Sequence, residues 1–175
     1  MTQDQARSTF APVWGVFLLF ASTAGSLVFA CATPFAAAAA LAALTLPPRL
    51  ALMTTMGVWL GNQAMGFLLL GYPLTLSAMA WGPVLGGSAI LATAAAIHVG
   101  ALFERADLRR FVAGFAAALI VQQALVLAVG LHEGTASLQV AVAVSALNAV
   151  WFVLLGAIHR LVSEVAMRGQ PVVVR

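Results

Sequence analysis

Residues 33–49 read TPFAAAAALAALTLPPR, an apolar run with one proline at its start and two at its end. Proline cannot continue a helix that is already running, so this stretch predicts a separate helix over about 35–46. Such a helix is too short for a normal crossing of the hydrocarbon core, which needs about 20 residues. The number of membrane crossings in the chain depends on whether this short helix is one of them.

The composition of the chain is that of a membrane protein. Of its 175 residues, 63% are hydrophobic and only 7% are charged, and the mean hydropathy is +1.05. Soluble domains carry about 25% charged residues, and a surface this poor in charge would not keep a folded domain in water. We therefore exclude a soluble enzyme, a disordered tail and a nucleic-acid binder, although the isoelectric point is about 10.5.

Prolines, glycines and charged turns divide the rest of the chain into five further apolar segments. Together with the short helix they predict an all-α fold, an integral membrane bundle of six transmembrane helices. The bundle is expected to form a single polytopic domain over residues 1–175. The expected helices cover about 13–31, 35–46, 50–70, 76–103, 111–131 and 138–158.

The arginines decide between five and six crossings, because basic residues favour the cytoplasmic side of a membrane. With six crossings and a cytoplasmic N-terminus, all arginines fall in cytoplasmic segments, whereas the outer loops carry only His132 and Glu133. Without the short helix, Arg49 would lie in the membrane or the arginines would be scattered over both faces. The sequence thus predicts six spans with both termini cytoplasmic. An alanine-rich chain with arginine but no lysine further indicates a bacterial inner membrane. The cytoplasmic segments are 1–12, 47–49, 104–110 and the tail after Ile158.

Carboxamide side chains in three of the expected helices fall at one depth. Asn62, Gln122 and Asn148 each lie nine or ten residues from the outer end of their helix, roughly 13–15 Å deep at about 1.5 Å per residue. A carboxamide offers two donors and an acceptor, which suits a neutral ligand rich in heteroatoms. The expected spans contain no acidic residue and no arginine, which argues against a proton relay and against most membrane hydrolases.

Aromatic residues accompany this layer of amides and complete a predicted uncharged binding site. Trp59 and Trp151 lie within one helical turn of the amides, and Tyr72 and Trp81 are expected at the outer mouth. Amides in membrane helices also form hydrogen bonds that hold neighbouring helices together. The amides could therefore bind a ligand or join helices, and the sequence leaves both roles open. The predicted substrate-binding residues are Trp59, Asn62, Gln63, Tyr72, Trp81, Gln122, Asn148 and Trp151.

Nothing in the sequence indicates a metal, a cofactor or a catalytic centre. The three histidines are expected at different depths, and Cys31 has no cysteine or histidine neighbour at ligand spacing. The chain also lacks a Walker motif and a dinucleotide-binding glycine motif. We therefore expect that the protein is not an enzyme, and that any uphill transport draws its energy from another chain.

Between Pro47 and Arg105, about a third of the chain, the motifs have a recognisable order. Pro48-Arg49 follows the short helix, a glycine-containing helix ends in Gly71-Tyr72-Pro73, and the glycine-rich segment 81–87 precedes Glu104-Arg105. This order resembles the substrate-binding S components of energy-coupling-factor (ECF) vitamin transporters, and the biotin-type S components in particular.

The resemblance implies a function and a set of partners. The chain would be the membrane-embedded substrate-capture subunit for uptake of a vitamin or cofactor precursor, with a transmembrane coupling subunit and cytoplasmic ATPases as partners besides membrane lipid. The implied partner interface comprises the small-residue pair Ala21 and Gly25 on the first helix, and Arg105 and Arg109 in the charged loop. The alternative is a non-catalytic structural or assembly subunit of a larger membrane complex.

Overall fold

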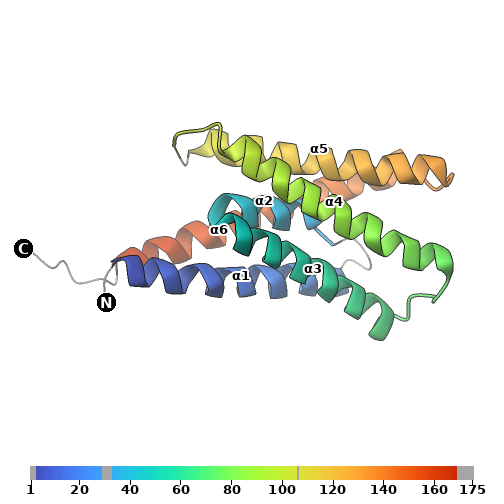
Figure 1. Cartoon of the computed structure of the whole chain (residues 1–175), viewed down its shortest axis with the longest axis horizontal. Helices are drawn as coiled ribbons and strands as arrows, with labels where there is room; N and C mark the ends of the chain where they lie inside the picture. The colour runs from blue at the N-terminus through green and yellow to red at the C-terminus, as the bar shows by residue number, and fades with distance from the viewer. Residues whose placement is uncertain (1–2, 29–32, 106, 169–175) are drawn as a thin grey trace, which may run out of the picture.

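The computed structural model describes residues 3–28, 33–105 and 107–168. Over these residues the chain is all-α, as predicted, and contains no strand. The helices pack as a bundle in which one short element is surrounded by longer ones (Figure 1). They are α1 (Gln3–Val28), α2 (Phe35–Thr45), α3 (Pro48–Leu68), α4 (Leu76–Gly100), α5 (Leu108–His132) and α6 (Leu138–Arg168).

Two helices, α1 and α6, extend by ten residues past the ends that the sequence indicated, and these added ends meet. Helix α1 begins at Gln3 rather than near residue 13 and continues through Pro12, and α6 continues ten residues past Ile158 to Arg168. The added turns pack on each other, because the ring of His159 lies 5.8 Å from that of Phe10 and 4.7 Å from that of Trp14, centroid to centroid. The expected end of the first helix near Cys31 lies outside the described residues.

Within the described residues, three helices are long and apolar enough to cross a membrane, namely α4, α5 and the part of α6 from Leu138 to Val165. Their outward faces carry large apolar side chains, such as Ile120 on α5, which is 67% exposed, and Val153 on α6. Helix α1 contributes a shorter apolar segment, Phe10–Gly25. These features fit a membrane protein, because a surface of this kind is stable against lipid and not against water.

Helix α2 is the core of the bundle. All ten residues from Phe35 to Leu44 are buried, and the helix contacts each of the other five helices. A helix that is apolar on every face belongs in an interior, and its alanines let neighbouring backbones approach closely. The short apolar run is therefore explained by packing within the protein rather than by contact with lipid.

The segments that carry the described arginines lie toward one end of the bundle, on the left of Figure 1. They are the start of α1, the α2–α3 junction, the α4–α5 loop and the last turns of α6. We call this the arginine end. The α3–α4 and α5–α6 loops lie at the opposite end, and α2 extends from the arginine end only part of the way toward it.

The tight packing of α2 predicts that it tolerates no added volume. Ala40 is fully buried beside alanines of α4 and α5, so Ala40→Leu should lower the free energy of unfolding by about 1–3 kcal/mol. Thermal unfolding of the detergent-solubilised protein measures this loss. Ala94→Leu, at an exposed position of α4, is the matched control and should unfold like the wild type. Equal stability of the two variants would contradict the enclosed position of α2.

Candidate functional site

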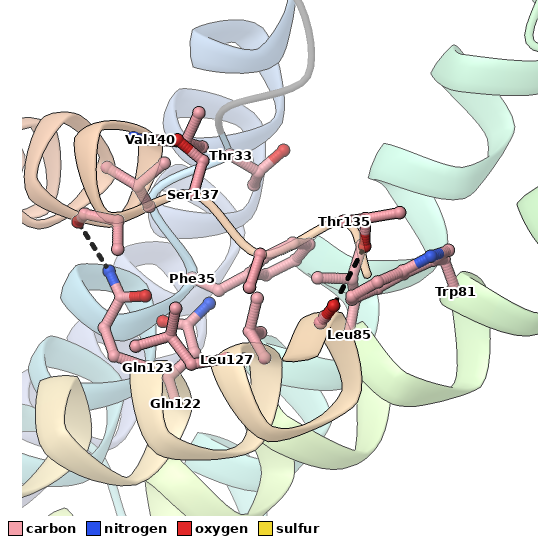
Figure 2. A pocket seen from close by; sticks show the side chains of 15 residues that line it. Thr33, Phe35, Trp81, Leu85, Gln122, Gln123, Leu127, Thr135, Ser137 and Val140 are labelled. Atoms are coloured by element: carbon pink, nitrogen blue, oxygen red, sulfur yellow. Dashed lines mark hydrogen bonds between the residues drawn. The ribbon is translucent and has the colours of Figure 1, made fainter. Parts of the chain in front are cut away.

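A cavity of about 260 Å³ lies between α5 and α6, at the end of the bundle opposite the arginines (Figure 2). Phe35, the first residue of α2, lies on one side of it, and Trp81 and Leu85 of α4 lie on another. The remaining walls come from α5, α6 and the loop between them. These residues are Gln122, Gln123, Val126, Leu127, Gly130, Thr135, Ala136, Ser137, Val140, Ala141 and Val144, and Thr33 adjoins Phe35.

The α5–α6 loop folds back tightly over this end of the cavity. The amides of Thr135 and Ala136 both donate to the carbonyl of Gly130, at 2.8 and 3.0 Å. Gly134 has φ +70°, a left-handed conformation that only glycine adopts at little cost and that ends α5 in a turn. Ser137 then begins α6 by accepting a hydrogen bond from the amide of Val140 at 3.4 Å. The loop is thus a compact wall rather than an open strand.

Gln122 is a buried polar side chain in the cavity wall. It is only 5% exposed, and its Oε1 atom is buried with no hydrogen-bond partner among the described residues. Figure 2 shows its carboxamide rising from α5 into the space beside Phe35 and Leu127. Buried polar atoms are nearly always paired in proteins, so the carboxamide of Gln122, in the wall of the cavity, holds an unused hydrogen-bond acceptor that a rotation of the carboxamide would turn toward the interior.

The adjacent Gln123 has a structural role instead. Its Nε2 donates to Ser145 Oγ at 2.8 Å and to the carbonyl of Ala141 at 3.2 Å. These bonds tie α5 to α6 along one edge of the cavity, and Figure 2 shows the one to Ala141 as a dashed line. Two neighbouring residues of the same type therefore do different things, because one helical step turns their side chains to different surroundings.

Two other predicted amides, Asn62 and Asn148, form hydrogen bonds at the start of α2. Asn62 of α3 accepts a hydrogen bond from the Thr33 hydroxyl. Asn148 of α6 is fully buried, accepts from the backbone amide of Ala37 at 3.0 Å and donates to the carbonyl of Val144 at 2.9 Å. A buried helix start has backbone N–H groups without partners in its own helix, and Asn148 supplies one from a different helix.

The predicted aromatic residues are distributed over several contacts. The indole N–H of Trp59 donates to the carbonyl of Gly82 at 2.8 Å, and a Cβ at Gly86 would lie 2.7 Å from its ring. Trp59 thus joins α3 to α4, with Gln63 beside Gly82. Trp81 differs, because it lines the cavity while its indole N–H donates to Glu133 Oε2 at 2.9 Å.

The structure therefore brings two of the eight predicted residues, Trp81 and Gln122, to one cavity. Tyr72 follows α3 and packs on Gly66 in the last turn of that helix. Trp151 packs on Gly25 of α1. A ligand-binding role for the other six residues stays a prediction. The site predicted from the sequence did not include Phe35, which was only expected to lie in a helix. It also did not include the polar residues of the α5–α6 loop, although their clustering in the sequence could have indicated them.

The residues of the predicted partner interface also fall into two groups, one buried within the bundle and one exposed. Gly25 is buried against Trp151, and Ala21 packs on the core formed around Leu18 and Leu155. This small-residue pair thus makes its contacts within the chain. Arg105 and Arg109, in contrast, are exposed at the arginine end.

The cavity is electrically neutral. None of the residues that line it is acidic, basic or a histidine. The nearby carboxylate of Glu133 accepts a hydrogen bond from the indole N–H of Trp81. Within the described ranges, no group of three or more histidine, cysteine, aspartate or glutamate residues is placed to hold a metal ion. The arrangement can bind a small neutral molecule through apolar contacts, hydroxyls and the carboxamide of Gln122.

No protein-family model, no curated protein and no solved structure matches this chain. The resemblance of residues 47–105 to the ECF substrate-binding subunits therefore stays an expectation. The cavity and its free acceptor are the physical basis for a functional proposal.

The two kinds of amide should respond differently to substitution. Asn148→Ala leaves the Ala37 amide without its acceptor in the core, so it should lower the free energy of unfolding by about 1–2 kcal/mol. Gln122→Leu removes an unpaired polar group, so the stability should stay the same or rise. Thermal unfolding in detergent compares the two. A larger loss for Gln122→Leu than for Asn148→Ala would contradict these assigned roles.

Proposed function

We propose that this chain is the substrate-capture subunit of a membrane transporter, similar to an ECF S component. It would bind a small molecule such as a vitamin or cofactor precursor and would not act as an enzyme. The observation that carries the proposal is the neutral cavity with the buried, unpaired oxygen of Gln122 in its wall. Such a cavity, largely apolar with few polar groups aimed inward, is the usual form of a small-molecule site.

The proposed topology has six crossings with both termini in the cytoplasm. The grouping of the arginine-bearing segments at one end of the bundle supports this orientation. Helix α2, with 11 residues, spans about 16 Å at about 1.5 Å per residue. This is shorter than the hydrocarbon core, but a helix enclosed by protein need not match the lipid thickness.

This orientation places the cavity in the outer half of the membrane, where it would receive substrate from outside the cell. Release to the inside would need energy that the chain has no motif to supply. A transmembrane coupling subunit and cytoplasmic ATPases are therefore the proposed partners. The exposed Arg105, in the α4–α5 loop, and Arg109, in the first turn of α5, lie at the end of the bundle that such cytoplasmic partners would reach.

Filling the cavity should abolish capture. Ala141 lines the cavity, whereas Ala143, on the same helix, is exposed and outside it. We expect a small molecule to co-purify with the wild type and with Ala143→Phe from native membranes. Its yield should fall at least about tenfold in Ala141→Phe, since the added ring occupies the volume of the ligand. Mass spectrometry of the extracted protein measures this yield.

The opposing result would identify a different function. If no small molecule accompanies the wild type and another membrane protein always does, the chain is a structural or assembly subunit. Equal ligand yields from the two phenylalanine variants would place the binding site outside this cavity.

The topology has its own test. In a Cys31→Ala background, which removes the single cysteine, Thr135→Cys should react with a membrane-impermeant maleimide added to intact cells. Arg105→Cys should react only after permeabilisation, because the arginine end faces the cytoplasm. The reverse labelling pattern would contradict the proposed orientation.

A further inference from the structure

We propose that the cavity selects an uncharged, compact ring compound that carries an N–H or O–H donor, and that Gln122 Oε1 accepts this donor. This inference rests on the proposed capture function and specifies its substrate class. It depends on three features of the cavity: the free acceptor, the absence of charge and the apolar walls.

Gln122 is the exception among the buried amides of the bundle. Asn62, Gln123 and Asn148 all have hydrogen-bond partners in neighbouring helices or at the start of α2. Gln122, 95% buried, has an oxygen with none in the described structure, and its side chain lines the cavity (Figure 2). The oxygen itself is enclosed by protein atoms, so a donor from a bound molecule would pair it after a rotation of the carboxamide about its last side-chain bond, a soft torsion that leaves the fold unchanged.

The surroundings disfavour a charged ligand. An ion entering the cavity would lose its hydration and meet no opposite charge on the walls. The start of α2 lies beside the cavity, and a helix start can attract anions. Here, however, the amide of Phe35 donates to the carbonyl of Thr33 at 2.8 Å and the amide of Ala37 to Asn148. Both groups are therefore engaged within the protein.

The walls suit a ring. Phe35 and Trp81 contribute aromatic side chains, and Leu127, Val140 and Val144 contribute aliphatic ones. The volume of about 260 Å³ is slightly below the usual range of about 300–1,000 Å³ for ligand pockets. A molecule of one or two rings therefore fits better than one with a long chain.

Three probes of similar size separate these features. Benzimidazol-2-one is neutral and has two ring N–H donors, its 1,3-dimethyl derivative has none, and benzoate is an anion. Titration calorimetry on the full chain in lipid nanodiscs measures their affinities. We expect wild-type protein to bind benzimidazol-2-one about tenfold or more tightly than the dimethyl compound, and to bind benzoate most weakly.

Gln122→Leu isolates the role of the acceptor. The difference in size between the two neutral probes is the same in both proteins, so a change in their affinity ratio reports the hydrogen bond. We expect this ratio to fall at least about fivefold in Gln122→Leu and to persist in Ala143→Phe. Ala141→Phe should bind neither neutral probe, which places both of them in the cavity.

The outcomes distinguish this inference from the capture function on which it rests. An unchanged ratio in Gln122→Leu, benzoate as the tightest ligand, or no binding of any probe to the wild type would overturn the substrate class. Capture itself would still stand if a co-purifying molecule were lost in Ala141→Phe. Probe binding unaffected by Ala141→Phe, together with no co-purifying molecule, would overturn both.

Discussion

The enclosed start of α2 is the constraint on which the rest of the bundle depends. A helix buried on all sides has no water to satisfy its first N–H groups, so the protein itself must supply partners. Asn148 reaches from α6 to the amide of Ala37, and Asn62 of α3 receives the hydroxyl of Thr33 just before the helix. These contacts join three elements at one point, and they fix how far α2 extends toward the opposite end.

The shortness of α2 also accounts for the cavity. Helices α4, α5 and α6 continue past its first residue, Phe35, toward the opposite end of the bundle (Figure 1). A longer central helix would fill the space between them. Because α2 begins partway along, that space is bordered by Phe35 and covered by the α5–α6 loop, and it stays open as the cavity of Figure 2. The shortness of α2 thus leaves the space that the proposed ligand would occupy.

The sequence predicts the elements better than it predicts their contacts. Pro34 and Pro47 delimit α2 because proline interrupts a helix, and three amides at one depth follow from counting residues. The sequence does not show which amide meets which partner. Gln122 and Gln123 are equally polar, and their roles differ only through the neighbours that α2 and α6 bring to each side. Helix α1 began earlier than predicted because contacts with His159 outweigh the interruption at Pro12.

The choice of glutamine at position 122 is best understood as a local cost kept for function. Leucine, valine and alanine occupy many interior positions of the described chain, and an aliphatic residue at position 122 would leave no unpaired oxygen. The neighbouring amides each offset their burial with a hydrogen bond, whereas Gln122 does not. Local departures from the rules of protein structure tend to occur at functional or strained sites. In the proposed complex, a donor on the bound molecule would pair the oxygen of Gln122, and the occupied site would then be more stable than the empty one.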